Sequence, residues 1–454
     1  MSQYWFGDLP SHWNVRKVRE LFSERNEKVS DIDYPPLSVG YMGVVPQLET
    51  AMKTSNGDNR KLIKQGDFAI NSRSDRKGAG GISKYDGSAS LIITVLKPQE
   101  DINGWYFHYL FRSSGFVEEY YRNGRGLVSD LWTTRYDEMR NIIVPTPPRV
   151  EQDQIVRFLD WKVGNISRFI REKRKEISRL NELINTRIKN AVLYGIHPGV
   201  PPQESGIGWI GNIPAHWDVR MLSQEATEQA LSNKTVHNQN LLSLSYGKIV
   251  NKDINKTDGL LPASFDTYQV VNDGNIILRL TDLQNDKKSL RVGLVTQTGI
   301  ITSAYTCLKP RAHVLPHYLY LLLHSYDVCK VFYGMGGGVR QSIGYNEIRR
   351  MLLPLPGRDE QQAIVDYCYR IREQTEQMIS ALKREIGLVT EYRTRLISDV
   401  VTGKIDVRDI EVPIFEPDEA DTEVDLINEE TDDEADVEKT ADDVEDDESA
   451  HDQH

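Results

Sequence analysis

Residues 7–16 read Gly-Asp-Leu-Pro-Ser-His-Trp-Asn-Val-Arg, and residues 211–220 read Gly-Asn-Ile-Pro-Ala-His-Trp-Asp-Val-Arg. The second stretch begins 204 positions after the first, and other motif pairs continue the correspondence. Among them, Tyr121-x-x-Gly-x-Gly matches Tyr333-x-x-Gly-x-Gly, and Glu151-Gln matches Glu360-Gln. A solenoid unit has only about 20–50 residues. The sequence therefore predicts a duplicated domain, with two similar surfaces for a partner that offers two sites at a fixed separation.

The charge of the chain is divided unevenly along its length. Residues 409–454 hold 22 acidic side chains and one basic side chain, Lys439, whereas the preceding 408 residues hold 45 acidic and 54 basic ones. The net charge of −12 thus combines a basic body with a strongly acidic tail. A basic body is compatible with a polyanionic partner, although by itself it is a weak indication. The tail has almost no aromatic residue, and we expect it to be disordered.

Composition also limits the cellular setting. The three cysteines, Cys307, Cys329 and Cys368, lie far apart and show no metal-ligand spacing, which favours a reducing compartment. We find no secretory signal pattern at the N-terminus. The longest apolar stretches, such as residues 318–323, are far shorter than the roughly 20 residues that span a bilayer. We therefore expect a cytoplasmic protein.

Each copy of the repeat has the pattern of an α+β domain. Residues 91–96 and 274–280 are typical of buried strands. Residues 105–111 and 317–323 have the pattern of a helix that follows these strands. Each copy then closes with a Pro-rich strand, and proline stops a sheet because it has no N–H to donate.

A long helix is predicted after each Pro-rich strand. From Glu151 to Tyr194 the first helix would be roughly 65 Å long at 1.5 Å per residue, more than a small domain can bury. A spacing of about 3.5 residues between apolar side chains favours a coiled coil, and we expect the two helices to pair antiparallel. The positions of this seam are Ile166, Ile170, Lys173, Ile177, Leu180, Ile184, Arg187 and Ala191 in the first helix, and Ile371, Thr375, Met378, Leu382, Glu385, Val389, Tyr392, Leu396 and Val400 in the second.

The fold class predicted from these patterns is α+β, with two globular domains related by the internal repeat and joined by two long antiparallel coiled-coil helices. The predicted segments are globular domain 1 (1–150), spacer helix 1 (151–195), a linker (196–210), globular domain 2 (211–358), spacer helix 2 (359–404) and the acidic disordered tail (405–454).

Catalytic and metal-binding motifs are not found in the sequence. The Pro-Pro pairs do not fit the loop with which amino-methyltransferases hold the target amine. There is no phosphate-binding loop of the Gly-x-x-x-x-Gly-Lys-Ser/Thr type, no His-Glu-x-x-His pair and no Cys-x-x-Cys. His12 and His216 stand beside tryptophans, where a packing or capping role is expected.

Polar and basic clusters instead occupy the predicted loops of each domain. Arginine and lysine can bond the guanine edge, asparagine and glutamine the adenine edge, and serine or threonine suits phosphate oxygens. Taken singly, any one cluster is better explained as a solvated loop; the clusters gain weight because Arg125 and Arg340 fall in the same neighbourhood of both repeats. The candidate DNA-binding residues are Arg60, Lys61, Asn71, Arg73, Arg76, Lys77, Arg122, Arg125, Ser129 and Trp132 in the first domain, and Arg279, Thr281, Lys287, Lys288, Arg291, Arg340, Gln341 and Ser342 in the second.

The first long helix has a further basic run. Such runs are usually only a solvated face, but along a duplex they could contact phosphates without reading sequence. The run comprises Arg168, Arg171, Lys173, Arg174, Lys175 and Arg179.

The combination of motifs resembles the specificity subunit of type I restriction–modification systems over roughly residues 1–408. The motifs are Gly-x-Ile/Leu-Pro-x-His-Trp at the start of each copy, Pro-x-Pro followed by Glu-Gln-x-x-Ile-Val at 151–156 and 360–365, and the helix end at 392–407. The first copy departs at its close, where Leu-Tyr-Gly-Ile stands at 193–196 in place of Val-Thr-Gly-Lys. The acidic tail lies outside the pattern.

The resemblance implies a non-catalytic subunit that reads a bipartite target in double-stranded DNA. The two globular domains would be target-recognition domains that each read one half of the target, and the helices would set their separation. It further implies docking of two adenine-N6 methyltransferase subunits and of motor–nuclease restriction subunits. S-adenosylmethionine, ATP and Mg²⁺ would belong to those partners, with no cofactor in this chain. Two alternatives stay open from the sequence: an autonomous nuclease or methylase, and a coiled-coil interaction scaffold that does not read DNA sequence.

Overall fold

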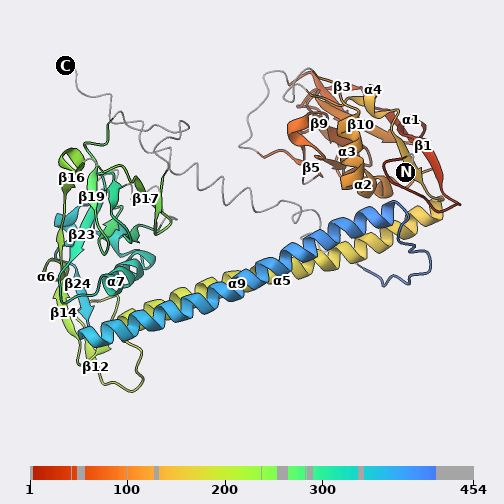
Figure 1. Ribbon diagram of the computed structural model, residues 1–454. Coiled ribbons are helices and arrows are strands. Elements are labelled where there is room, and N and C mark those ends of the chain that lie inside the picture. Colours follow the sequence, from red (N-terminus) through yellow and green to blue (C-terminus); the bar gives the residue numbers. More distant parts are fainter. Residues whose placement is uncertain are drawn as a thin grey trace, which may run out of the picture. The chain divides into compact units, whose positions relative to one another are not determined.

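The computed structural model describes residues 4–41, 43–48, 57–99, 101–126, 132–236, 238–252, 264–281, 283, 290–335 and 342–415. These residues form a mixed helix and sheet fold that divides into two compact units (Figure 1). Within the described residues, unit 1 consists of the chain up to 176 together with 381–415, and unit 2 consists of 177–380. The division falls inside two long helices, α5 (Arg149–Tyr194) and α9 (Arg358–Val401).

Unit 1 is built on a four-stranded antiparallel sheet in the order β2-β10-β7-β8. A three-stranded sheet (β3-β6-β9) and two pairs (β1-β11 and β4-β5) complete the strands described in this unit. The elements are β1 (Asn14–Lys17), α1 (Val18–Leu21), β2 (Phe22–Glu24), β3 (Lys28–Val29), β4 (Leu37–Gly40), β5 (Gly43–Pro46), β6 (Arg60–Ile63), β7 (Phe68–Asn71), the 3-10 turn η1 (Ser74–Arg76), β8 (Gly80–Ile82), β9 (Gly87–Ala89), β10 (Ile93–Pro98), α2 (Gly104–Arg112), α3 (Ser114–Arg122), α4 (Tyr136–Met139) and β11 (Ile143–Thr146).

The core of unit 1 lies on both faces of the four-stranded sheet. On one face, Phe68 and Leu96 pack with Phe107 and Phe111 of α2. On the other face, Val95 packs in a smaller cluster with residues of β4, β5, β6 and β9. Helix α2 begins at Gly104 because the side chain of Asn103 accepts a hydrogen bond from the backbone N–H of Trp105, at 2.9 Å. This start confirms the helix predicted over 105–111.

Unit 2 repeats the sheet topology of unit 1, with each strand of its four-stranded sheet in the corresponding position. Its four-stranded sheet is β15-β23-β20-β21, with β16-β19-β22, β17-β18, β14-β24 and an additional pair β12-β13. The elements are β12 (Pro202–Glu204), β13 (Asn212–Pro214), β14 (Asp218–Met221), α6 (Leu222–Glu225), β15 (Ala226–Glu228), β16 (Leu231–Ser232), η3 (Asn233–Thr235), β17 (Leu242–Ser245), β18 (Lys248–Asn251), β19 (Gln269–Val271), β20 (Ile276–Leu278), β21 (Val292–Leu294), β22 (Gly299–Ile301), β23 (Thr306–Pro310), α7 (Pro316–Val328), η4 (Val331–Gly334), α8 (Tyr345–Ile348) and β24 (Leu352–Leu355).

The structure corrects several details of the predicted elements. The strand predicted over 274–280 is limited to β20 (Ile276–Leu278), and the predicted seam position Arg187 of α5 is exposed while Ile188 is buried. The strand predicted over 91–96 begins only at Ile93, because Leu91 and Ile92 lie exposed in the preceding turn. The seam predicted along α9 is displaced at two positions, since Met378 and Tyr392 are 57% and 55% exposed. Arg393 is buried instead of Tyr392, because the burial stripe of a straight helix drifts away from a strict 3.5-residue repeat.

No helix among the described residues is long and apolar enough to cross a membrane. The prediction of a disordered tail over 405–454 is wrong for residues 405–415, because Val407 is buried and Ile410 and Val412 pack against the unit 1 core. The rest of the predicted tail, from 416 onward, lies outside the described residues, and so do several of the candidate DNA-binding residues.

Candidate nucleic-acid interface

The Gly-x-Leu-Pro-x-His-Trp motif that opens unit 1 is bonded to the first turn of α5. His12 Nε2 lies 2.8 Å from Glu151 Oε2, and Trp13 Nε1 donates to Glu151 Oε1 at 3.0 Å. Glu151 is only 9% exposed and stands where the helix dipole favours a carboxylate. The packing role expected for the His-Trp pair is confirmed for Trp13, which is buried, whereas His12 is exposed and contributes its contact to Glu151. The motif thus ties the start of unit 1 to the first turn of α5.

The corresponding motif of unit 2 makes the same contacts with α9. His216 Nε2 lies 2.7 Å from Glu360 Oε2, and Trp217 Nε1 donates to the same oxygen at 3.1 Å. The duplicated motif is thus a structural joint between a sheet and a long helix in each unit.

Each unit also holds the end of a long helix through a buried tyrosine. In unit 1 the Tyr106 hydroxyl donates to the Val401 carbonyl at the end of α9, at 2.8 Å. In unit 2 the Tyr318 hydroxyl donates to the Val192 carbonyl near the end of α5, at 3.2 Å. Burial raises the pKa of both tyrosines well above the ordinary value, so the hydroxyls stay protonated and remain donors.

Three loop segments of unit 1 are joined by backbone hydrogen bonds into one surface. We call this surface the unit 1 loop cluster, consisting of residues 72–77, 120–126 and 132–134. Thr134 N–H donates to the Ser72 carbonyl at 2.9 Å, and Arg125 and Thr133 exchange two bonds of 2.8 and 2.9 Å. Two basic clusters that are about 50 residues apart in the sequence are therefore neighbours in the structure.

The charged side chains of this cluster are largely exposed. Arg73, Arg76, Arg122 and Arg125 are all exposed at the surface. Arg125 Nε lies 3.3 Å from Glu138, but the Arg125 side chain is still 83% exposed. An exposed ion pair of this kind is worth only about 0–1 kcal/mol, so the guanidinium can be redirected to a ligand at little cost.

A shallow hollow lies within the same cluster. Lys77 Nζ lies 2.6 Å from Glu118 and 4.6 Å from the centre of the Tyr121 ring. Trp132 Nε1 donates to the Tyr121 carbonyl at 2.9 Å, which fixes the indole beside that ring. The residues that line the hollow are Ser72, Arg73, Ser74, Lys77, Tyr120, Tyr121, Trp132 and Thr134.

Three of the candidate residues in unit 1 point into the fold rather than toward a ligand. Arg60 is 5% exposed and its Nε donates to Ser88 Oγ at 2.9 Å; burial lowers the pKa of this guanidinium. Asn71 is 6% exposed and accepts from Arg73 N–H at 3.0 Å. Lys61 is paired with Glu24 at 3.1 Å. Arg60 and Lys61 therefore brace β6, and Asn71 shapes the loop that presents Arg73.

Arg291 has a similar internal place in unit 2. Its side chain is completely buried, and Nη1 donates to the carbonyls of Arg279 and Thr281 at 3.2 and 2.7 Å. Its Nε also donates to the Tyr333 hydroxyl at 3.1 Å. Arg291 thus supports the loop after β20, on which Arg279 and Thr281 are partly exposed and near which Ser342 is exposed. Ser129, Lys287, Lys288, Arg340 and Gln341 lie outside the described residues.

Backbone bonds define which loop positions correspond between the units. Thr134 N–H donates to Ser72 in unit 1, and Ile343 N–H donates to Leu280 in unit 2, each at 2.9 Å. The corresponding pairs are therefore Ser72 with Leu280, Arg73 with Thr281, and Thr133 with Ser342. The loops are anchored alike but present different side chains.

Sequence reasoning missed two features of these surfaces. In the sequence, Tyr121 and Tyr333 stand out only as parts of the repeat, yet Tyr121 forms a wall of the hollow and Tyr333 accepts a bond from Arg291. The repeated Tyr-x-x-Gly-x-Gly motif could have identified both. The acidic partners Glu118 and Glu138 had no sequence signal, because a lone glutamate on a helix is common.

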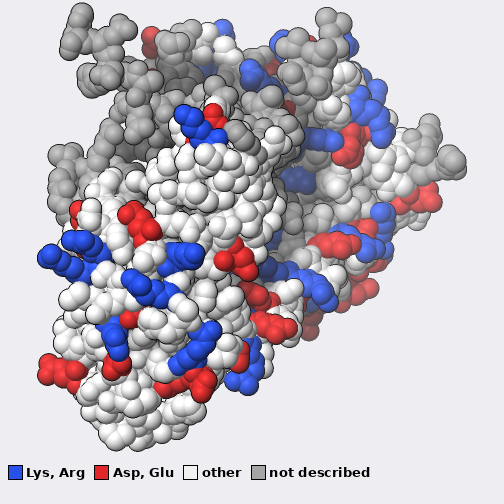
Figure 2. Space-filling view, turned by 60° about the vertical axis from the view of Figure 1, so that its left-hand side comes forward, with Lys and Arg blue, Asp and Glu red and all other residues white. Residues whose placement is uncertain are grey.

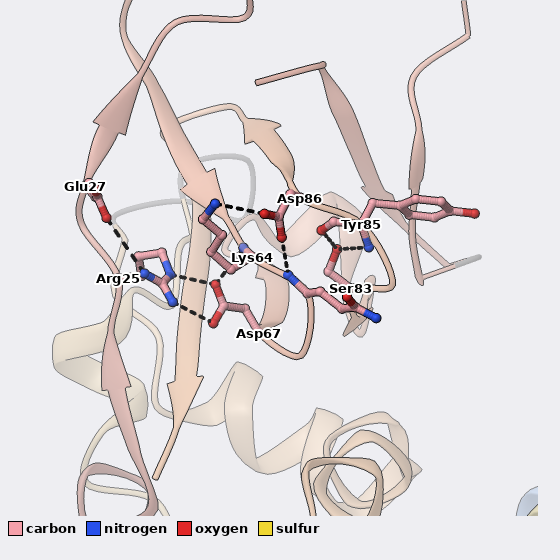
Figure 3. A network of polar contacts seen from close by, with 8 residues as sticks. Arg25, Glu27, Lys64, Asp67, Ser83, Tyr85 and Asp86 are labelled. Atoms are coloured by element: carbon pink, nitrogen blue, oxygen red, sulfur yellow. Dashed lines mark hydrogen bonds and ion pairs between the residues drawn. The ribbon is translucent and has the colours of Figure 1, made fainter. Parts of the chain in front are cut away.

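Outside the unit 1 loop cluster, positively and negatively charged side chains are mixed. On the face seen in Figure 2, lysine and arginine side chains are interspersed with aspartate and glutamate. Figure 3 shows one local network in unit 1, where Arg25 forms a two-pronged ion pair with Asp67, at 2.6 and 3.1 Å, and Lys64 pairs with Asp86 at 2.8 Å. Among the described residues no cluster of histidine, cysteine, aspartate or glutamate could hold a metal ion.

This chain is similar in sequence to a known protein. The chain is 21% identical over 443 residues to a protein of Methanocaldococcus jannaschii assigned as the type I restriction enzyme MjaX specificity subunit, covering 88% of this chain and 96% of that protein. No family model matches the chain.

Solved structures give a similar result. A chain from a structure on complex assembly and conformational transition of the type I restriction–modification system superposes with a TM-score of 0.62 at 14% identity, covering 88% of this chain and all of that one. The HsdS subunit of Thermoanaerobacter tengcongensis gives a TM-score of 0.47 at 16% identity, covering 88% and 98% of the two chains. The predicted resemblance is confirmed: over most of its length this chain is similar in sequence to a type I restriction enzyme specificity subunit, and its fold is similar to that of a chain from a type I restriction–modification system.

Proposed function

We propose that this chain is the DNA sequence-specificity subunit of a type I restriction–modification complex, a non-catalytic subunit whose two units each read one half of a bipartite target. The observation that carries the proposal is the pair of loop surfaces anchored alike but differing in chemistry. Arg73 in unit 1 corresponds to Thr281 in unit 2, so a guanidinium in one unit stands where the other has a hydroxyl, whereas Thr133 and Ser342 both present a hydroxyl. A single readout surface used twice would favour the same side chain at the position of Arg73 and Thr281.

The exposed residues of the unit 1 loop cluster suit a duplex in two ways. Arg73, Arg76, Arg122 and Arg125 offer guanidinium groups that can bond a guanine edge or a phosphate. Trp132 supplies a half-buried aromatic side chain held at a fixed orientation beside them. We include Thr281 and Ser342 on the unit 2 surface, together with the candidates outside the described residues. We leave out Arg60 and Arg291, because buried guanidiniums bonded inside the fold cannot reach a base.

The long helices would act as an antiparallel coiled-coil spacer. Within unit 1, Arg393 Nη1 donates to Ser167 Oγ at 3.2 Å, and Lys173 Nζ lies 3.2 Å from Glu385. Residue numbers rise along α5 as those of its partners fall along α9, which is the antiparallel order. In unit 2, Ile184 and Ile188 of α5 share a buried cluster with residues of α9. We propose that this spacer fixes the half-site separation.

The partners follow from the same proposal. Two adenine-N6 methyltransferase subunits and the restriction subunits would dock on this chain, and S-adenosylmethionine, ATP and Mg²⁺ would be bound by them. The chain alone, incubated with DNA, Mg²⁺ and methyl donor, should give no product. Any turnover by the chain alone would support the autonomous enzyme instead.

The direct test is binding by the assembled complex. The target is first obtained from a genome-wide map of N6-methyladenine with and without the gene. Duplexes are then made with the left half, the right half or the spacer length altered. We expect each alteration to weaken binding, whereas equal affinity for all duplexes would favour a scaffold that does not read sequence.

Arg125→Ala adds a residue-level test of the proposal. We expect it to weaken recognition of one half-site only, by about 1–3 kcal/mol for a lost bidentate contact. Arg140→Ala is the matched control, because Arg140 is also exposed on unit 1 and paired with a nearby carboxylate, Asp137 at 3.4 Å, but lies outside the loop cluster. The control should bind as the unaltered complex does.

A further inference from the structure

The chain that follows α9 packs back along α5 within unit 1. Gln154 of α5 donates through Nε2 to the carbonyls of Val407 and Ile410, at 3.0 and 2.8 Å. Val407 is 1% exposed and belongs to the unit 1 core, and Ile410 and Val412 pack against the same core. Residues 407–412 are therefore held firmly on α5 and are not a loose end.

The last described residue, Phe415, lies further along the same helix. Its ring lies so close to Gly164 that a Cβ added to that glycine would come within 2.3 Å of it. The Arg168 guanidinium lies 5.8 Å from the centre of the ring. From Gln154 to Arg168 is about 21 Å along a helix that rises 1.5 Å per residue. The segment thus advances along α5 toward its C-terminal end.

The face of α5 that carries this segment continues as a basic stripe. Residues spaced by three or four share one face of a helix, so Gln154, Gly164 and Arg168 are followed on it by Arg171 and Lys175. We call Arg168, Arg171 and Lys175 the basic stripe. All three belong to unit 1. Arg168 lies against the Phe415 ring, and Arg171 and Lys175 follow beyond it, with Lys175 Nζ also 2.8 Å from Glu172 in an exposed pair.

The sequence after Phe415 has the opposite charge. Residues 416–454 contain 20 acidic side chains and a single lysine, and the acidic residues begin at once with Glu416, Asp418 and Glu419. Charge complementarity therefore indicates that the acidic segment 416–454 occupies the basic stripe. The point at which the described chain ends indicates the same segment.

We propose that the acidic segment 416–454 binds along the basic stripe of α5 and competes there with the phosphates of non-target DNA. The inference rests on the proposed function, because it takes DNA as the competing polyanion. The segment acts as an internal polyanion that weakens sequence-blind binding. Base contacts made by the loop clusters are not opposed by it, so the discrimination between target and non-target DNA increases.

The contact is tested first without DNA. A chain ending at Phe415 is titrated with a labelled peptide of residues 416–454, and binding is followed by fluorescence anisotropy. We expect binding that weakens steeply as salt is raised, because exposed charges are screened over about 10 Å at 0.1 M. The triple variant Arg168→Ala/Arg171→Ala/Lys175→Ala should lose most of it. The matched control, Arg370→Ala/Arg384→Ala/Arg395→Ala, removes the same charge from exposed positions of α9 and should keep it.

The effect on DNA is tested in the complex with the methyltransferase subunits. At low salt, the chain ending at Phe415 should bind a non-target duplex about tenfold more tightly than the full chain, and the difference should vanish at high salt. A full-length chain with the tail acids changed to Asn and Gln should behave like the truncated one, and a shuffled acidic tail like the original.

The outcomes separate the two proposals. If the truncated and full chains bind non-target DNA equally while target preference persists, the tail inference is overturned and the proposed function stands. Peptide binding that the control triple variant loses equally would also overturn it. If neither chain prefers any DNA sequence, the proposed function fails, whatever the peptide does.

Discussion

Units 1 and 2 differ in the chemistry of one turn, which precedes β7 in unit 1 and β20 in unit 2. In unit 1, Arg25 holds Asp67 with two charged hydrogen bonds, and Asp67 is 2% exposed. In unit 2 the corresponding pair is neutral, with Gln229 Nε2 3.4 Å from Asn275 Oδ1. The two units therefore share the geometry of this turn but differ in the charge of its side chains.

The backbone contact explains why both versions fold. Lys64 N–H donates to the Asp67 side chain at 2.8 Å, and Asn272 N–H donates to the Asn275 side chain at the same distance. Either side chain provides the oxygen that closes the turn, so its charge is free to vary. The loops proposed to contact DNA follow the same rule, since their anchoring bonds agree while exposed side chains such as Arg73 and Thr281 differ.

The largest effect is expected from core truncation in either unit. Phe111→Ala in unit 1 should cost about 3–5 kcal/mol and Leu323→Ala in unit 2 about 2–5 kcal/mol, because both side chains are completely buried. Hydrogen exchange read by mass spectrometry should show lost protection in the altered unit. An equal loss of protection in both units would mean that the two units do not unfold independently.

A smaller effect is expected when the turn chemistry is exchanged. Asp67→Asn removes the two charged hydrogen bonds between Arg25 and its buried carboxylate partner, leaves Arg25 only the longer ion pair with Glu27 at 3.7 Å, and should lower the free energy of unfolding of unit 1 by about 1.5–3 kcal/mol. The double change Arg25→Gln/Asp67→Asn, which copies unit 2, should recover part of that loss. Denaturant titrations measure both. A double variant less stable than the single one would contradict the equivalence of the two turns.

Acid should weaken both units through buried histidines. Burial and the nearby charge of Arg372 lower the pKa of His324 to about 4, and burial lowers the pKa of His108 well below the ordinary value of 6.5. The unfolded chain takes up protons below about pH 6.5 while the folded chain does not. Stability from the neutral form is therefore complete above that pH and declines as the pH falls toward 4, by about 1.4 kcal/mol per pH unit for each proton.

The variant His324→Gln makes this pH dependence specific to one unit. Protection of unit 2 amides should then fall less steeply between pH 6.5 and 4, while unit 1 keeps the slope set by His108. An unchanged slope in unit 2 would show that His324 is not the group that titrates.

Periodicity and repetition were enough to predict much of the fold. The paired His-Trp motifs identified the two frames, and the apolar spacing identified α5 and α9. The register of α9 was wrong at Tyr392, because the burial stripe of the helix drifts from a strict 3.5-residue repeat and buries the neighbouring Arg393, which bonds Ser167 of α5.

Site prediction was limited by burial. Arg60 and Arg125 look alike in the sequence, yet the first is bonded to Ser88 inside unit 1 and the second is 83% exposed on its side chain. The two arginines differ because long-range strand pairing surrounds Arg60 with neighbours and leaves Arg125 at the surface. Residue type and loop context can therefore propose a readout surface but cannot sort its members from the residues that support it.

Methylation maps of three strains test most directly whether the two units read different half-sites. The strains carry the unaltered gene, Arg73→Ala/Arg125→Ala in unit 1, or Thr281→Ala/Ser342→Ala in unit 2. We predict a bipartite N6-methyladenine motif that loses definition in one half for the first variant and in the other half for the second. A contiguous motif, or relaxation of the same half by both variants, would contradict the proposal.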